Sequence, residues 1–171
     1  MIESMAEQIA VSIKRANEKG TVSVEVMKFS LTIILNTAII LVLITIGGTL
    51  TGKLPETLCA FLAFAGLRIV SGGFHFNTAL LCTLASTLLL VVIPHVPITK
   101  YWDILLLFLS LLLVGIYAPS NLEGHSRIGR ERYPLLKGLS LVIVGMNFIW
   151  LNPILTKAFL AQSLLLIRIR R

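Results

Sequence analysis

The most constraining feature of this sequence is a 22-residue run without a charged side chain, Phe29–Leu50. As a helix rising about 1.5 Å per residue, the run would be roughly 33 Å long, enough to cross the hydrocarbon core of a bilayer. Charged residues make up 13% of the 171-residue chain, against roughly 25% in an ordinary soluble domain. A soluble globular fold, a disordered chain and a disulfide-rich secreted scaffold are therefore excluded. The sequence predicts an all-α, polytopic transmembrane helical protein.

Five further apolar runs follow, separated by Gly, Pro or charged residues. They are Leu58–Val70, Ala79–Ile93, Tyr101–Ala118, Leu135–Leu151 and Ile154–Ile167. The last run is short, so it either spans the membrane with its ends snorkelling or lies in the interface. Residues 29–171 are therefore predicted to form one transmembrane helical domain with about six spans.

Lysine and arginine gather in three places: the N-terminal segment, the loop after Tyr101–Ala118, and the C-terminal tail. With six spans these clusters fall on one side of the membrane, and the positive-inside rule makes that side cytoplasmic. Five spans would instead place the C-terminal arginines outside. Both termini are therefore predicted to be cytoplasmic. The net charge of +7 is interpreted as an orientation signal, and no nucleic-acid partner is expected.

The first 28 residues differ from the rest in being polar and amphipathic. Apolar side chains recur there at spacings of three and four, at Ile2, Met5, Ile9, Ile13 and Ala16. This period predicts a short amphipathic helix, and a bilayer surface is its natural partner in a membrane protein. The alternative is a helix packed on neighbouring protein. Residues 1–28 are thus predicted to be an interfacial segment.

One stretch combines polar and reactive residue types at membrane depth: Arg68, Gly72, Gly73, His75, Asn77 and Cys82. Ionisable residues are costly there, so they indicate a function. A Cys with a His is typical of nucleophilic catalysis, because the imidazole accepts the thiol proton and the imidazolium then stabilises the thiolate. On a straight helix the two residues would lie about 10.5 Å apart, so they can meet only if the backbone after Gly72 is not helical. Irregular backbone at this depth needs cover, which predicts a sheltered cleft open to the cytoplasm.

Simpler interpretations stand beside this one. A Cys in an apolar helix is usually a small core residue, which suits Cys59. A lone His at an interface can be an ordinary polar residue, and Gly-Gly can be a turn. A metal site is a weaker hypothesis, because His75, His95, His125 and Cys82 have none of the usual ligand spacings. No metal and no cofactor are expected.

The stretch RIVSGGFHFNTALLC resembles the signature of the AgrB family, the accessory gene regulator B membrane peptidases of Gram-positive quorum sensing. That family has an Arg, a Gly-Gly-aromatic-His and a Cys seven residues after the His. In this chain the matching residues are Arg68, Gly72, Gly73, Phe74, His75 and Cys82. Tyr117-Ala118-Pro119 at the end of a run, followed by a basic loop, is similar as well. Size and hydropathy extend the resemblance over nearly the whole chain.

The resemblance implies a cysteine endopeptidase in the bacterial cytoplasmic membrane that removes the C-terminal tail of an AgrD-like propeptide and leaves a cyclic thiolactone or lactone peptide. It implies His75 as base, Cys82 as nucleophile, and an active site toward the cytoplasm. An acidic propeptide tail would find a docking site in the basic loop at Arg127, Arg130 and Arg132. That loop can equally be a topology determinant only. A homodimer is consistent with the family.

Several roles stay open. Arg68 could hold a substrate carboxylate or cap a helix C-terminus, and Asn77 is one candidate to orient His75. Two other classes also remain: a small transporter or channel subunit without catalytic activity, and a non-catalytic membrane partner. The transporter hypothesis predicts that Cys82→Ala is tolerated, whereas the peptidase hypothesis predicts loss of propeptide cleavage with folding retained.

Overall fold

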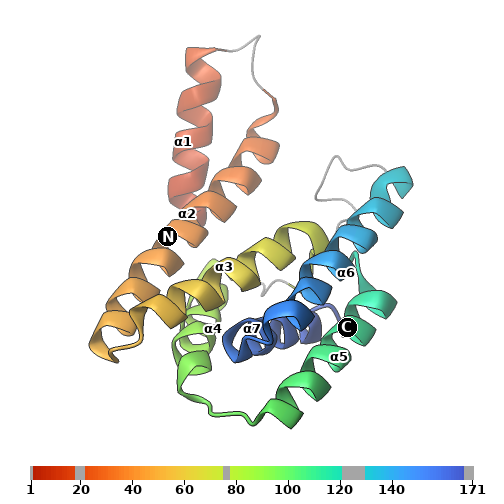
Figure 1. Ribbon diagram of the computed structural model, residues 1–171. Coiled ribbons are helices and arrows are strands. Elements are labelled where there is room, and N and C mark those ends of the chain that lie inside the picture. The colour runs from red at the N-terminus through yellow and green to blue at the C-terminus, as the bar shows by residue number, and fades with distance from the viewer. Residues whose placement is uncertain (1, 18–21, 75–77, 121–129, 168–171) are drawn as a thin grey trace.

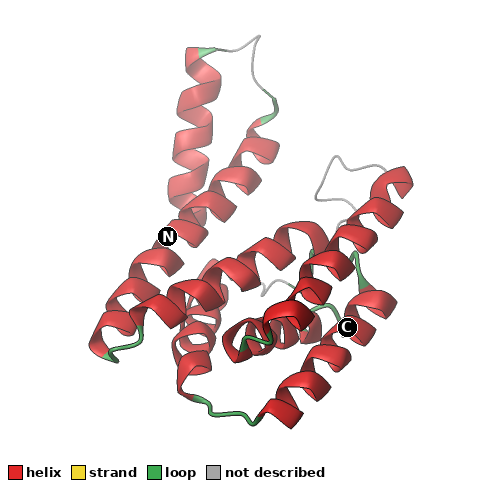
Figure 2. Ribbon diagram, viewed as in Figure 1, coloured by secondary structure: helices red, strands yellow, loops and turns green. Residues whose placement is uncertain are grey.

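The computed structural model describes residues 2–17, 22–74, 78–120 and 130–167 of the chain. These residues form seven α-helices and two short 3₁₀ helices, and no strand occurs among them (Figures 1 and 2). The elements are α1 (Ile2–Ala16), α2 (Val24–Leu50), α3 (Leu54–Ser71), α4 (Ala79–Val92), η1 (Ile93–His95), α5 (Lys100–Tyr117), η2 (Arg130–Arg132), α6 (Tyr133–Trp150) and α7 (Pro153–Leu164). The predicted all-α architecture is confirmed.

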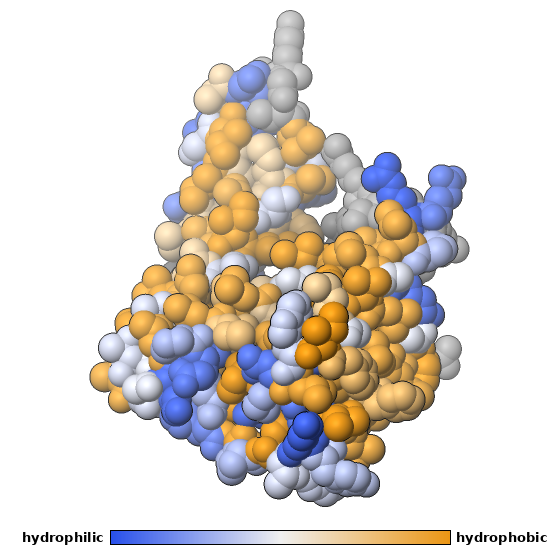
Figure 3. Space-filling model, viewed as in Figure 1, coloured by the Kyte–Doolittle hydropathy of each residue, from blue (hydrophilic) through white to orange (hydrophobic). Residues whose placement is uncertain are grey.

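Four helices are long and apolar enough to cross a membrane: α2, α3, α5 and α6. Their large apolar side chains often point outward, as at Leu50 and Ile149, which are 83% and 76% exposed. Orange, apolar surface accordingly covers much of the visible face of the bundle (Figure 3). The chain is therefore a membrane-embedded helical protein. α4 and α7 are shorter, so a total of six spans and the cytoplasmic termini remain predictions.

Helix ends follow the residues that cannot continue a helix. α2 begins five residues before the uncharged run, because Glu25 and Lys28 are accommodated in its first turns. α3 ends where Gly72 adopts a positive φ of 69°. α7 begins with Pro153 in its first turn, and the Asn152 side chain accepts a hydrogen bond from the Ile154 amide at 2.9 Å. These are the usual start and stop signals of helices.

The short helix α7 lies inside the bundle and packs against α3, α5 and α6 (Figure 1). It contributes to two buried apolar clusters: Ala158 packs with residues of α2, α3 and α4, and Phe159 packs with residues of α3, α5 and α6. The run Ile154–Ile167, which was predicted either to span the membrane or to lie in its interface, thus forms a helix that packs in both apolar clusters.

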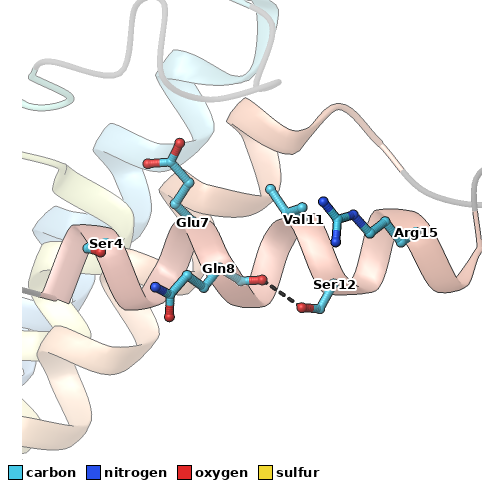
Figure 4. A pocket seen from close by; sticks show the side chains of 6 residues that line it. All are labelled: Ser4, Glu7, Gln8, Val11, Ser12 and Arg15. Atoms are coloured by element: carbon cyan, nitrogen blue, oxygen red, sulfur yellow. Dashed lines mark hydrogen bonds between the residues drawn. The ribbon is translucent and has the colours of Figure 1, made fainter.

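The N-terminal segment forms the expected helix, and α1 packs along α2 (Figure 1). Only one edge of its apolar face is buried there, at Ile2, Ala6 and Ala10, while Met5, Ile9 and Ile13 remain 37–48% exposed. Lys28 of α2 pairs with Glu7 at 2.6 Å. The polar face of α1 carries a shallow hollow lined by Ser4, Glu7, Gln8, Val11, Ser12 and Arg15 (Figure 4). The alternative of packing on protein therefore holds for one edge, and the exposed apolar edge stays available for the predicted contact with lipid.

Candidate functional site

Helix α3 ends at Ser71 and helix α4 begins at Ala79. Gly72 and Gly73 have φ angles of 69° and 131°, which side-chain-bearing residues rarely adopt. A Cβ on Gly73 would also lie 3.2 Å from Gln162 Nε2 and 3.3 Å from the Leu165 carbonyl oxygen. Residues 72–74, the described residues directly after α3, therefore have the non-helical backbone that the predicted His75–Cys82 pair requires.

The segment after Ser71 is held by backbone from two distant parts of the chain. The Gly73 amide donates to the Ser120 carbonyl at 3.0 Å, and the Ser120 amide donates to the Ser71 carbonyl at 2.9 Å. The Phe74 amide donates to the carbonyl of Leu165, just past α7, at 2.8 Å. Ser120 directly follows the Ala118-Pro119 bond, which is cis. The two sequence segments that carry the family resemblance thus lie side by side.

Arg68 and Gln162 tie this segment to α3 and α7. The Arg68 guanidinium donates from Nη1 to Gln162 Oε1 at 3.1 Å and from Nη2 to the Phe74 carbonyl at 2.6 Å. Gln162 is fully buried, and its Nε2 donates to the Gly72 carbonyl at 2.7 Å and to Ser71 Oγ at 3.3 Å. We call these two side chains and residues 72–74 the Arg68–Gln162 clamp. Among the described contacts, Arg68 thus donates to a carbonyl just beyond the end of α3, and both roles expected for it stay predictions.

The Arg68 guanidinium is also fixed from its face, with its central carbon 5.7 Å from the centre of the Phe64 ring. This distance is within the range of a cation–π contact. Guanidinium has five N–H donors, and the clamp uses two of them. Within the described part of the chain, three donors of this cation at the helix break therefore make no hydrogen bond.

Cys82 lies in the first turn of α4 and is 8% exposed. Its amide donates to the Thr78 carbonyl at 3.2 Å, and Thr78 is the N-cap residue whose hydroxyl accepts from the Leu81 amide. The thiol is within electrostatic range of the Arg68 guanidinium. Thr83 contacts the Asn36 side chain and so fixes this turn to α2. A nucleophile here would lie in the first turn of a helix and near a cation.

Other candidates lie elsewhere. His75, Asn77 and Arg127 are outside the described residues, as is the side chain of Arg130. Arg132 is exposed and occupies the N-cap position of α6. The structure thus brings Arg68, Gly72 and Gly73 together near Cys82 and leaves the geometry of the His75–Cys82 pair as a prediction.

Two residues of this cluster, Gln162 and Ser120, were not among the sequence candidates. Ser120 has no local signal of its own, because its contribution is made by its backbone. Gln162 did have one: a polar amide within the apolar run Ile154–Ile167 is costly at membrane depth and indicates a buried polar partner.

Taken together, the fold and the cluster define a class: a membrane-embedded helical protein with a polar site at an interrupted helix pair. Residues 3–168 match the family described as Accessory gene regulator B. The chain therefore belongs to the AgrB family, the accessory gene regulators of quorum sensing.

Curated relatives agree. An AgrB-like protein of Halalkalibacterium halodurans is 32% identical over 97% of this chain and 84% of its own length. An AgrB-like protein of Listeria monocytogenes is 31% identical over 74% of this chain and 62% of its own length. Protein FsrB of Enterococcus faecalis is 34% identical over 55% of this chain and 41% of its own length. No solved structure matches the chain.

Proposed function

We propose that this protein is a membrane cysteine endopeptidase that removes the C-terminal tail of an AgrD-like propeptide and closes the remaining peptide into a thiolactone or lactone ring. Membership of the AgrB family gives the biological setting. The observation that supports the chemistry is the helix break at Gly72–Gly73, with Cys82 one turn into the next helix and the Arg68 guanidinium within electrostatic range.

In the proposed first step, His75 accepts the Cys82 thiol proton and the thiolate attacks the carbonyl carbon of the scissile peptide bond. Collapse of the tetrahedral intermediate breaks the C–N bond, and the imidazolium returns the proton to the departing amine of the tail. The product is a thioester between the propeptide and Cys82. The Arg68 guanidinium and the backbone near Gly72 and Gly73 are candidates to stabilise the developing oxyanion.

In the second step, a substrate thiol or hydroxyl attacks this thioester and its proton passes to the Cys82 sulfur. Thioester exchange to a thiolactone is nearly balanced in energy, and no water is consumed. Water would instead hydrolyse the intermediate, so the site must exclude it. The clamp serves this purpose, because protein groups rather than water satisfy the polar backbone atoms at Gly72 and Phe74.

We also propose how the propeptide reaches the site. The propeptide's amphipathic segment would bind the cytoplasmic leaflet, which raises its effective concentration at the site. Arg127, Arg130 and Arg132 would attract its acidic tail. Residues 1–28 would lie along the same leaflet, residues 29–171 would form the transmembrane domain, and two chains would associate as a homodimer.

The test is co-expression with a propeptide carrying a C-terminal tag, followed by detection of the released tail and by mass spectrometry of the remaining peptide. We expect cleavage by the unchanged protein and a core peptide one water lighter than the linear form. Cys82→Ala should abolish cleavage. His75→Ala should lower the rate by about 10²–10⁴-fold, the usual contribution of a general base.

Cys59→Ala is the matched control, because it removes the other free thiol, on α3 away from the helix break. It should leave cleavage unchanged. Cleavage that survives Cys82→Ala at normal membrane yield would contradict the peptidase and favour a transporter or a non-catalytic partner. A core peptide that is always linear would contradict the cyclisation step alone.

A further inference from the structure

A second polar site lies at the far end of α5. An open pocket of about 400 Å³ is lined by Ile98, Lys100, Asp103, Trp150, Leu151 and Pro153, where α5 begins and α6 ends. α5 runs from this pocket to the Ala118-Pro119-Ser120 segment, whose Ser120 backbone bonds to Ser71 and to Gly73 of the clamp. Its 18 residues correspond to about 27 Å of helix, so the pocket and Cys82 belong to opposite ends of the bundle.

Asp103 gives the pocket a buried carboxylate oxygen for which the described residues provide no hydrogen-bond donor. Its side chain is only 3% exposed, and Oδ1 is buried without a hydrogen-bond partner among the residues that the structure describes. Lys157 is within electrostatic range, but its ammonium donates to the carbonyls of Ile93 and Val96, both at 2.6 Å. A buried carboxylate oxygen is costly unless a donor satisfies it. The missing donor is therefore expected to come from outside the residues that the structure describes.

The surroundings indicate where that donor comes from. Tyr101, Trp102 and Trp150 are 73%, 53% and 62% exposed at this end of the bundle. Exposed tyrosine and tryptophan at the end of a membrane-crossing helix mark the level of the lipid headgroups. The pocket thus opens where a bilayer presents its polar groups, and Trp150 gives it an aromatic wall that suits a cation.

Charge in the pocket is paired. Lys100 and Asp103 are three positions apart on α5 and so face the same side, with roughly 5–6 Å between their Cβ atoms. One group attracts an anion and the other requires a donating cation. A phosphate followed by a primary ammonium, as in an ethanolamine phospholipid, has both charges in this order and at comparable separation.

We propose that this pocket binds the headgroup of phosphatidylethanolamine. The ammonium donates to Asp103 Oδ1 beside the Trp150 ring, and the phosphate lies against the Lys100 ammonium. A choline headgroup carries the same charges but has no N–H, so it cannot satisfy Asp103. Selection between the two lipids therefore depends on hydrogen bonding rather than on charge.

The experiment is native mass spectrometry of the full chain, extracted in mild detergent from vesicles with equal amounts of phosphatidylethanolamine and phosphatidylcholine of the same acyl chains. We expect retention of the ethanolamine lipid to exceed that of the choline lipid several-fold. Asp103→Leu, which removes the acceptor and keeps a similar shape, should bring the ratio close to one. Glu131→Gln, which neutralises an exposed carboxylate of η2, should leave it unchanged. Equal retention by the unchanged protein, or a preference that survives Asp103→Leu, would overturn the proposal.

A second series needs no variant and so does not depend on the folding of Asp103→Leu. Vesicles with the mono-, di- and trimethylated ethanolamine lipids remove one N–H at a time. Retention should fall along the series and drop most at the last methyl group, where the final donor is lost. Retention independent of methylation would exclude the Asp103 contact. Displacement of the lipid by an equimolar amount of soluble phosphoethanolamine would show that the natural ligand is a small molecule rather than a phospholipid.

Discussion

Replacing Gln162 with methionine removes both polar atoms of this fully buried side chain and keeps an unbranched chain of similar length. Arg68 Nη1 then loses its acceptor at 3.1 Å, and the Gly72 carbonyl loses its donor at 2.7 Å. The apolar contacts of α7 on either side are untouched. The substitution therefore tests the clamp rather than the core.

The size of the effect follows from these two hydrogen bonds. A hydrogen bond to a charged group contributes about 1.5–3 kcal/mol, and a neutral one about 0.5–1.5 kcal/mol. Arg68 is only half-buried, so water can replace part of what it loses. We expect Gln162→Met to lower the free energy of unfolding by about 2 kcal/mol. Since each 1.4 kcal/mol is tenfold, propeptide cleavage should fall by roughly 10- to 100-fold if the clamp holds the reacting segment in place.

The assay is an SDS titration in mixed micelles for stability, alongside the propeptide cleavage assay for activity. Gln162→Glu separates the two bonds, because its carboxylate still accepts from Arg68 but cannot donate to the Gly72 carbonyl. Ser163→Ala is the matched control: Ser163 is equally buried, and its hydroxyl donates to Phe159 within α7 at 2.7 Å. If Gln162→Met and Ser163→Ala behave alike in both assays, the clamp does not have the role argued here.

Three further substitutions, two of them with a comparison variant, can be measured by the same titration. Gly73→Ala should lower the free energy of unfolding by about 1–3 kcal/mol through backbone strain, because φ is 131° and the new Cβ crowds the clamp. Its comparison variant is Gly66→Ala, which has open space around it and should raise the free energy of unfolding by up to about 1 kcal/mol. Lys157→Met should lower the free energy of unfolding by about 1–3 kcal/mol, because two carbonyls past the end of α4 lose their donor. Its comparison variant is Lys53→Met, which loses one exposed ion pair and should lower the free energy of unfolding by about 0–1 kcal/mol. Asn147→Leu should cost about 2 kcal/mol, since its side chain bonds the Asn152 backbone and the Thr156 hydroxyl; a neutral result would mean that water replaces these bonds.

Much of the fold is legible in the sequence, because crossing a membrane imposes a strict rule on length and polarity. Each apolar run became a helix, and Gly72 and Pro153 limit helices where the residue types predict it. The position of α7 could not be predicted in this way. Hydropathy measures how apolar a run is, but only the packing of neighbouring helices decides whether the run faces lipid or the core.

The N-terminal helix shows the same limit. Its periodicity predicts one apolar face, yet α2 covers only the edge with Ile2, Ala6 and Ala10. Two of these are alanines, whose small side chains let helices approach closely. The larger Met5 and Ile9 stay exposed. The spacing of apolar residues thus predicted the apolar face of α1, whereas side-chain size determined which part of that face packs against α2.

The candidate site was predictable in part for a related reason. Gly72-Gly73 predicts a break in the helix, since glycine adopts backbone angles that other residues avoid. Arg68 at membrane depth predicts a polar partner. The partner itself, Gln162, is 94 positions away. Ser120 contributes through backbone atoms alone, which no residue type encodes. Long-range pairing of this kind arises only when the helices are assembled.

The short length of α7 explains how irregular backbone can exist inside this bundle. Its 12 residues extend about 18 Å, well short of the roughly 30 Å hydrocarbon core, so its C-terminal end stops within the protein. Chain that turns at this depth must have its polar groups satisfied by protein. The end of α7 meets that need: the Leu165 carbonyl accepts from Phe74, and Gln162 donates to Gly72 while accepting from Arg68. A longer, wholly apolar helix in this place would fill the core equally well but would leave those groups unpaired. The place where α7 ends is therefore as important as the apolar surface that it buries, and shortening or lengthening α7 by one turn should disrupt the Gly72–Phe74 segment before it disrupts the apolar core.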